Sequence, residues 1–295
     1  MKNIIVITGG AGFVGTNLIS FLLKNTKYKI LSIDNYSSGL KINHIKNKKV
    51  KYIKGNTRNI STLLNSKKNK INAIFHFGEF SRIYQSFLKM GECIDSNTVG
   101  SHAVFNFCLN NKIKLIYSAT SASLGNKGRD KDLSPYAFTK SINLELLENL
   151  KKWFKMKYEI IYFYNVYGPK QISIGNMATV IGIFENAYKN KKPLPVVRPG
   201  TQSRKFTHIS DTVKVCYDAW KKNKCRHYSV SSKKDYSILE VAKLFGSKIK
   251  LLPARSGERY ASALTNMNLS NKVYKNFGRI SLKTYIEKFK NRHKR

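Results

Sequence analysis

Short apolar runs, rich in β-branched and aromatic residues, alternate with longer stretches of mixed polarity along the first 166 residues of the chain. Among the longer stretches, 14–25, 97–111 and 136–155 are predicted to form helices. This alternation predicts an α/β fold with a doubly wound parallel sheet, the Rossmann fold. The apolar runs, which we expect to form its buried strands, are 3–8, 29–34, 50–55, 71–77, 113–120 and 158–166.

Past residue 166 the alternation loosens, and Pro193, Pro195 and Pro199 punctuate the sequence. A strand-like piece and a helix-like piece then follow, which indicates that part of the chain returns to the first sheet. The predicted division is a first domain over 1–166 with a returning segment near 203–225, and a smaller, partly discontinuous C-terminal region over 167–202 and 226–295.

Three glycines follow the first predicted strand in "VITGGAGFVGTNL" and lead into the first predicted helix. In this setting Gly9, Gly12 and Gly15 allow a tight turn, a close approach of the backbone to a pyrophosphate, and close packing of helix on strand. The second strand ends at Asp34, where a carboxylate can accept both hydroxyls of an adenosine ribose and would repel a 2′-phosphate. The pattern predicts a site for NAD rather than NADP; the alternative is a plain turn and a surface aspartate.

A second polar group consists of Tyr136 and Lys140 in "YAFTK", four residues apart on a predicted helix. This spacing puts both side chains on one face, where the ammonium favours the ionised phenol and so makes it a base. Thr120, at the end of the strand 113–120, brings a hydroxyl to the same cleft above the carboxyl ends of the strands. Without that hydroxyl, the pair would be interpreted as surface residues of a lysine-rich chain.

The chain is strongly basic, with 54 Lys and Arg against 16 Asp and Glu and a formal net charge of +38. Such a charge attracts polyanions, so a nucleic-acid-binding protein must be considered. The lysines are spread along the whole chain and are not gathered in one arm. This distribution favours a solvated basic surface, which would also suit an anionic substrate.

The remaining composition indicates a globular cytoplasmic protein. The N-terminal sequence shows no cleavable apolar segment, and no apolar run approaches the ~20 residues of a membrane helix. The four cysteines, Cys93, Cys108, Cys216 and Cys225, lie far apart without metal-ligand spacing. We therefore expect reduced thiols and no metal site.

A series of ordered motifs covers nearly the whole chain. They are "TGGAGFVG" (8–15), "IDNYSSG" (33–39), "IFHFGEFSR" (74–82), "DSNTVGS" (95–101), "YSATSASLG" (117–125), "SPYAFTK" (134–140), "YFYNVYGPKQ" (162–171), "SRKFTHISD" (203–211) and "RSGE" (255–258). With them the chain resembles the extended short-chain dehydrogenases/reductases, and among these the NAD-dependent nucleotide-sugar epimerases, most closely the UDP-glucose 4-epimerases. The resemblance implies that 1–166 binds NAD and that the C-terminal region binds a nucleotide sugar.

The resemblance also implies a role for individual residues. Tyr136 would be the catalytic base, Lys140 would bond the nicotinamide ribose, and Thr120 would hold the reacting oxygen. The implied NAD contacts are Gly9, Gly12, Phe13, Val14, Gly15, Asp34, Asn35, Ser38, Gly39, Asn56, Thr57, Phe77, Gly78, Asn97, Tyr136 and Lys140. The implied substrate contacts are Asn165 at the sugar, Arg204 and Arg255 at the diphosphate, Glu258 at the nucleotide ribose, and Ser262 beside the C2 substituent.

Three positions in the cofactor motifs depart from the family pattern. Asn56 stands where an aspartate usually contacts the adenine amino group, a bond that an asparagine carbonyl can still accept. Gly78 and Glu79 replace the usual pair of alanines after His76. Glu79 thus places a carboxylate near the cofactor pyrophosphate or the active-site rim, and the sequence assigns it no role.

Three activities are open at this point. The first is epimerisation at C4 of a UDP-hexose or UDP-N-acetylhexosamine, through a transient 4-keto sugar, by a homodimer joined through helices near 97–111 and 136–154. The second is another reaction of the same family, either a reduction or an epimerisation at a different carbon. The third is a non-catalytic Rossmann protein that binds nucleic acid, against which the intact Tyr136, Lys140 and Thr120 argue. Dehydratases of the family need an acidic pair directly after the threonine. This chain has Ser121 and Ala122 there, which argues against dehydration.

Overall fold

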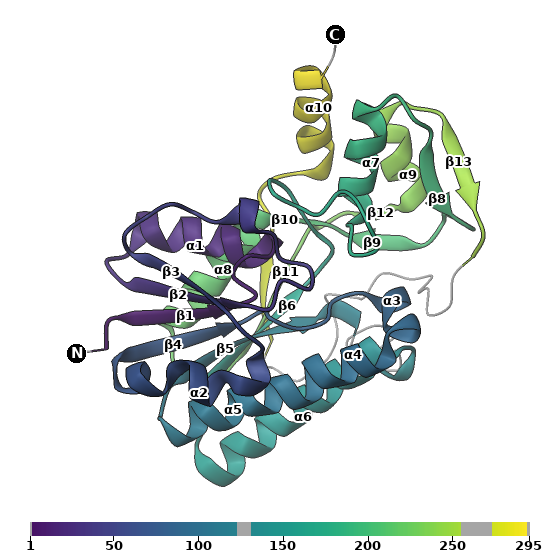
Figure 1. Ribbon diagram of the computed structural model, residues 1–295. Helices are drawn as coiled ribbons and strands as arrows, with labels where there is room; N and C mark the ends of the chain where they lie inside the picture. The colour runs from purple at the N-terminus through teal and green to yellow at the C-terminus, as the bar shows by residue number, and fades with distance from the viewer. Residues whose placement is uncertain (1, 123–130, 255–272, 294–295) are drawn as a thin grey trace.

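One large parallel sheet forms the centre of the protein in the computed structural model, which describes residues 2–122, 131–254 and 273–293 (Figure 1). From edge to edge its eight strands are β14 (Val273–Phe277), β11 (His227–Ser231), β6 (Tyr158–Phe163), β5 (Lys114–Thr120), β4 (Ile71–His76), β1 (Ile4–Thr8), β2 (Lys29–Asp34) and β3 (Val50–Lys54). Every pairing between neighbouring strands is parallel. The predicted doubly wound Rossmann sheet is therefore confirmed.

Helices cover both faces of this sheet (Figure 1). On one face lie α1 (Phe13–Asn25) and α8 (Ile209–Lys221), and on the other lie α2 (Ile60–Leu64), α4 (Met90–Ile94), α5 (Ser101–Asn110) and α6 (Pro135–Phe154). Shorter helices on the connections are η1 (Lys41–Asn43), η2 (Thr57–Asn59), η3 (Asn65–Lys70), α3 (Ile83–Leu88) and the π-helical η4 (Asp95–Gly100). No helix among the described residues is both long enough and apolar enough to span a membrane.

The alternation of side chains along β1 explains the two helical layers. Ile5 and Ile7 pack in one core together with Leu18 of α1. Val6, which points to the opposite side, packs in a second core with Phe105 of α5. Because successive residues of a strand face opposite sides, a fully apolar strand must be covered on both faces.

A small lobe lies beside the carboxyl ends of these strands (Figure 1). It consists of α7 (Val180–Lys189), β8 (Leu194–Val197), β9 (Ser203–Lys205), β12 (Asp235–Ser237), α9 (Ile238–Phe245), β13 (Ile249–Leu252) and α10 (Leu282–His293). Its own apolar core includes Phe184, Val196 and Phe245. A short parallel pair joins β7 (Val166–Tyr167) to β10 (Thr207–His208) at its base.

The chain returns to the large sheet over a longer segment than the expected 203–225. After α8, β11 pairs with β6, and β14 then pairs with β11 at the edge. Both strands fall within the range 226–295 that the sequence assigned to the C-terminal region. The division into an NAD-binding domain and a sugar-binding region stays a prediction.

The strand order reverses direction between β1 and β4. From β1 the chain proceeds outward to β2 and β3, and then it returns to the other side of β1 to form β4, β5 and β6. At such a reversal the loops after adjacent strands diverge, which opens a crevice at the carboxyl ends of the strands.

Candidate active site

A cleft of about 520 Å³ lies at this crevice, between the ends of the large sheet and the small lobe. Its lining brings together most of the residues that the sequence singled out. They are Gly9, Gly12, Phe13, Val14, Gly15, Asp34, Asn35, Ser38, Phe77, Gly78, Thr120, Tyr136, Lys140, Asn165 and Arg204. Arg255, Glu258 and Ser262 lie outside the described residues.

The glycine loop connects β1 to α1, and packing explains two of its glycines. Gly9 has a φ of +69°, and a Cβ on it would lie 2.8 Å from the backbone of Phe77. A Cβ on Gly15 would lie 2.2 Å from the carbonyl oxygen of Gly9, so helix and loop touch there. The plain-turn interpretation thus accounts for these two positions as well as a cofactor site does.

The start of α1 supplies the feature specific to an anion site. Gly12 is the N-cap residue of the helix, and as a glycine it has no side chain with which to cap the first turn. The amides of that turn, which begins at Phe13, belong to residues that line the cleft, and they lie at the positive end of the helix dipole. This arrangement fits a dinucleotide pyrophosphate.

Asp34 ends β2 at the other side of the loop. Its side chain is buried, and its two oxygens accept the backbone N–H groups of Ala11 at 2.9 Å and Tyr36 at 2.8 Å. Burial raises the pKa of this carboxyl, whereas the backbone donors oppose the rise. A carboxylate has about four acceptor positions, so the two bonds leave capacity for ribose hydroxyls. Gly39 packs here, since a Cβ on it would lie 2.7 Å from the Asp34 Oδ1.

The predicted catalytic residues come from two neighbouring elements. Tyr136 and Lys140 lie in the first turns of α6, which starts where Ser134 Oγ accepts the N–H of Ala137 at 3.1 Å. Thr120 is the last residue of β5. All three side chains are buried and line the same cleft.

Glu79 is the residue whose role sequence reasoning missed. It lies in the loop after β4, and its side chain is 2% exposed. One carboxylate oxygen pairs with the Nζ of Lys140. The other accepts hydrogen bonds from Ser101 Oγ at 2.7 Å, from the Tyr117 hydroxyl at 3.0 Å and from Asn143 Nδ2 at 3.3 Å. Sequence reasoning could not assign this role, because nothing in "HFGEF" indicates which lysine pairs with Glu79.

On the small-lobe side of the cleft lie Asn165 and Arg204. Asn165 has a φ of +29°, and its Nδ2 donates to the carbonyl of Lys205 at 2.9 Å, which fixes the side chain at the start of β7. Arg204 is buried within β9. A further cation, Arg82, lines the cleft, and its Nε donates to the carbonyl of Met177 at 3.0 Å. In so basic a sequence, nothing distinguished Arg82 from surface charge.

Four predicted cofactor contacts lie off the lining of this cleft, namely Gly39, which packs against Asp34, and Asn56, Thr57 and Asn97. Asn56 accepts the N–H of Arg58 at 3.0 Å and so caps η2, which contains the buried Thr57. Asn97 is fully buried, and its amide accepts the N–H of Phe80 at 2.6 Å and donates to the Phe80 carbonyl at 3.1 Å. Asn97 therefore holds the loop that carries Glu79. Cofactor binding by these four residues stays a prediction.

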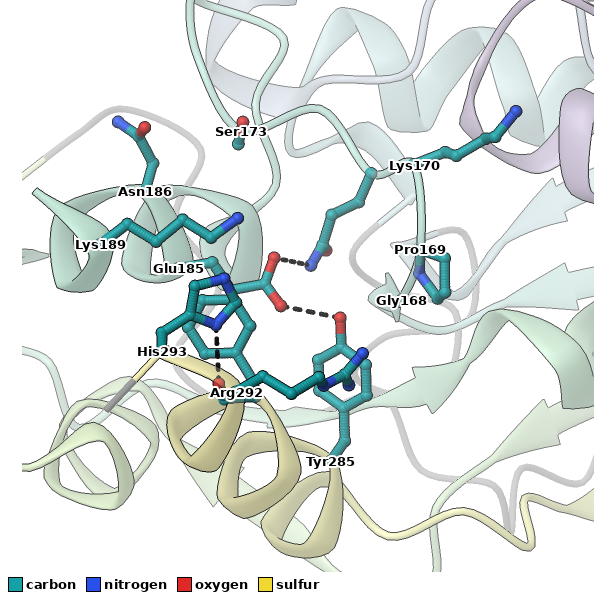
Figure 2. Close-up of a pocket in the computed structure, with 12 residues that line it drawn as sticks. Gly168, Pro169, Lys170, Ser173, Glu185, Asn186, Lys189, Tyr285, Arg292 and His293 are labelled. Atoms are coloured by element: carbon teal, nitrogen blue, oxygen red, sulfur yellow. Dashed lines mark hydrogen bonds between the residues drawn. The ribbon is translucent and has the colours of Figure 1, made fainter. Parts of the chain in front are cut away.

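A separate pocket of about 330 Å³ lies within the small lobe, between α7 and α10 (Figure 2). At its centre the carboxylate of Glu185 accepts hydrogen bonds from Gln171 Nε2 at 2.8 Å and from the Tyr285 hydroxyl at 2.7 Å. Burial raises the pKa of this carboxyl. The bonds tie α7 to α10, and none of the predicted site residues lines this pocket.

One cleft contains the glycine loop, the Asp34 carboxylate at the end of β2, and the group formed by Thr120, Tyr136 and Lys140. This combination defines a dinucleotide-dependent enzyme of the Rossmann class. Residues 5–231 match the NAD dependent epimerase/dehydratase family. The chain belongs to this family, a part of the extended short-chain dehydrogenases/reductases, and its cofactor is NAD.

Individual relatives have different activities. The chain is 30% identical over 225 residues to an ADP-L-glycero-D-manno-heptose-6-epimerase of Brachyspira hyodysenteriae, covering 72% of this chain and 70% of that enzyme. It is 28% identical over 266 residues to a dTDP-D-glucose 4,6-dehydratase of Dictyostelium discoideum, covering 81% of this chain and 60% of that enzyme. Its fold is similar to the UDP-glucose 4-epimerase of Thermotoga maritima, with a TM-score of 0.85, 20% identity, and coverage of 99% and 100%.

Proposed function

We propose that the protein epimerises a nucleotide sugar at C4, with a UDP-hexose or a UDP-N-acetylhexosamine as substrate. The observation that carries this proposal is that Thr120, Tyr136 and Lys140 share one cleft with the glycine loop and Asp34. The glycine loop and Asp34 would hold NAD, which would supply a reversible hydride acceptor for the interconversion of the two epimers through a transient 4-keto sugar.

Each catalytic side chain has a role that its chemistry suits. The Tyr136 phenolate takes the proton of the sugar hydroxyl and later gives it back, which is general base and general acid catalysis by one group. Lys140 donates to the nicotinamide ribose, and its positive charge favours the phenolate. The Thr120 hydroxyl holds the reacting oxygen in line with Tyr136.

The acidic residues of the cleft support an epimerase over a dehydratase. Ser121 and Ala122 follow Thr120 and are buried, and neither can act as an acid or base in the elimination of water. The carboxylates on the described lining belong to Asp34 and Glu79. Both already accept protein donors, Asp34 from backbone amides and Glu79 from Lys140.

The nucleotide diphosphate would lie toward the small lobe. Arg204 suits a diphosphate because a guanidinium can donate two parallel hydrogen bonds to phosphate oxygens. The Asn165 amide belongs to the same lining and suits a sugar hydroxyl. Arg255 and Glu258 would complete this part of the site, as the family resemblance implies.

We also propose a homodimer joined through α6 and the helices beside it. Ile94 and Val99 are 43% and 49% exposed, and on α6 Phe138, Ile142 and Trp153 are 52%, 39% and 62% exposed. At about 100° per residue, the three α6 residues fall on one stripe of the helix. Contiguous exposed apolar side chains of this kind mark protein interfaces.

The test of the activity is to incubate the purified protein with NAD and each of several UDP-hexoses, and to separate the products by chromatography. C4 epimers formed without net oxidation of the sugar support the proposal. A 4-keto-6-deoxy sugar would indicate a dehydratase, whereas epimers at another carbon or a product that consumes NADH would indicate the other reactions of the family.

A further inference from the structure

The Lys140 ammonium is held by two acceptors among the described residues. It pairs with Glu79 and donates to the carbonyl of Ser118, and it lies 4.7 Å from the centre of the Tyr117 ring. An ammonium has three N–H groups, so this arrangement fixes the side chain and leaves one N–H for a group in the cleft. Glu79 thus determines where the third N–H points.

A directed chain of hydrogen bonds fixes Glu79 in turn. Burial lowers the pKa of His76 to about 4, so its ring is neutral and has one donor and one acceptor nitrogen. Because the Ser101 hydroxyl donates to Glu79, it accepts from His76 Nε2 at 2.9 Å. His76 Nδ1 then accepts from Thr8 Oγ1 at 2.7 Å. The chain runs from the end of β1, beside the glycine loop, to Glu79.

Few of the surrounding groups carry charge at neutral pH. His76 on β4 is neutral, and burial raises the pKa of Cys93 on α4 and of Tyr117 on β5, which keeps both protonated. These described neighbours of the pair therefore add no charge of their own to it. The carboxylate therefore cancels most of the positive charge that Lys140 would otherwise direct at the cleft.

We propose that Glu79 is a positioning residue that holds Lys140 in its active geometry and, by neutralising its charge, sets the balance between oxidised and reduced cofactor in the site. The oxidised nicotinamide ring is positively charged and the reduced ring is neutral. An unpaired ammonium beside the ring would therefore disfavour NAD⁺ relative to NADH. Glu79 removes this penalty, and so it keeps the enzyme in the oxidised form with which an epimerase begins its cycle. The consequence for catalysis rests on the proposed function; the cofactor preference does not.

The test measures cofactor preference directly. Wild type, Glu79→Gln and Lys140→Met are brought to equilibrium with mixtures of NAD⁺ and NADH of known ratio, and bound NADH is measured by its fluorescence. Glu79→Gln should raise the ratio of Kd for NAD⁺ to Kd for NADH about tenfold, as one added charge several ångströms from the ring predicts. Lys140→Met should lower this ratio, because the negative charge of Glu79 is then left unpaired and favours the positively charged NAD⁺. The lost ribose bond affects both cofactors alike and cancels in the ratio.

Catalysis gives a second measurement. In Glu79→Gln the unpaired ammonium favours the Tyr136 phenolate, so the acid limb of the activity profile should move to lower pH by about one unit. Glu79→Asp, which retains the charge, should restore most of the wild-type profile. If no UDP-hexose is converted, the proposed function fails, and the cofactor ratio still tests Glu79.

Glu159→Gln is the matched control. Glu159 is also a fully buried carboxylate beside a buried lysine, with 3.4 Å between it and Lys114 Nζ, and it is not on the cleft lining. This variant should lose stability but keep the wild-type cofactor ratio and pH profile. A folded Glu79→Gln protein with an unchanged ratio overturns the proposal. If Glu79→Gln does not fold, Lys140→Met decides, and an unchanged or raised ratio overturns it.

Discussion

The carboxylate of Asp34 accepts the backbone N–H of Ala11 at 2.9 Å, so the end of β2 is bonded directly to the glycine loop. The same side chain accepts the N–H of Tyr36, which holds the turn after β2. Asp34 is thus both a structural support for the loop and the residue at the expected position of the adenosine ribose. These two functions can be separated by comparing cofactors.

Wild-type protein should bind NAD more tightly than NADP, because the buried Asp34 carboxylate repels a 2′-phosphate. Calorimetric titration of both cofactors measures this preference. Asp34→Asn retains an oxygen for Ala11 but removes the negative charge, so it should narrow the preference for NAD. Equal affinity of the wild type for the two cofactors would contradict this interpretation of the end of β2.

Tyr136→Phe should lower kcat by about 10²-fold to 10⁴-fold, the usual contribution of a general acid or base, while NAD remains bound. The measurements are steady-state kinetics and the amount of cofactor that co-purifies. Lys140→Met should shift the onset of activity to higher pH, since the phenol loses a cation that favours its ionisation. Near-normal turnover by Tyr136→Phe would exclude this tyrosine as the base.

The free energy of unfolding should decrease as the pH falls from about 6.5 to about 4, and the buried His76 should contribute to this decrease. Burial lowers the pKa of His76 in the folded protein from 6.5 to about 4, so the unfolded chain binds the additional proton over this range. The contribution is at most about 3 kcal/mol. Urea unfolding at several pH values measures it, and His76→Gln should have a shallower pH dependence. Parallel curves for the two proteins would rule out this contribution.

Wild-type protein should elute as a dimer in size-exclusion chromatography with light scattering. Ile142→Lys and Trp153→Lys should each give monomers, because the substitution places an unpaired charge in the apolar stripe of α6. Ile42→Lys is the control, since Ile42 is 86% exposed on η1, far from α6 in the sequence and on a different element. A monomeric wild type, or dimers that survive both α6 variants, would show that this face is not the interface.

UDP-N-acetylglucosamine should be used at least as well as UDP-glucose, because the resemblance implies that Ser262 stands where a bulkier residue would exclude an N-acetyl group. Comparison of kcat/KM for the two substrates tests this expectation. Ser262→Tyr should reduce kcat/KM for the N-acetylated sugar alone. If the wild-type protein does not use UDP-N-acetylglucosamine, or if Ser262→Tyr changes kcat/KM for neither substrate, another residue determines whether an N-acetyl group fits.

The sheet could be predicted because the strands of the first half, apart from β3 at the sheet edge, are rich in buried apolar residues, as buried parallel strands require. The run 71–77, for example, became β4 at Ile71–His76. The Glu79–Lys140 pair could not be predicted, since its residues lie 61 positions apart and the chain has 54 lysines and arginines. Asn97 illustrates a different limit of sequence reasoning. The motif identified this residue as an NAD contact, whereas its side chain makes two hydrogen bonds to the backbone of Phe80.

The path of the chain between the large sheet and the small lobe limits how relatives could be recombined. The chain leaves the sheet after β6, returns for α8 and β11, leaves again for β12 and α9, and returns once more as β14 before it ends in α10. A chimera made with a single crossover after β6 would therefore take β11 and the edge strand β14 from the second parent. Exchange of the small lobe alone would require a junction at every passage of the chain between the sheet and the lobe, and not one crossover.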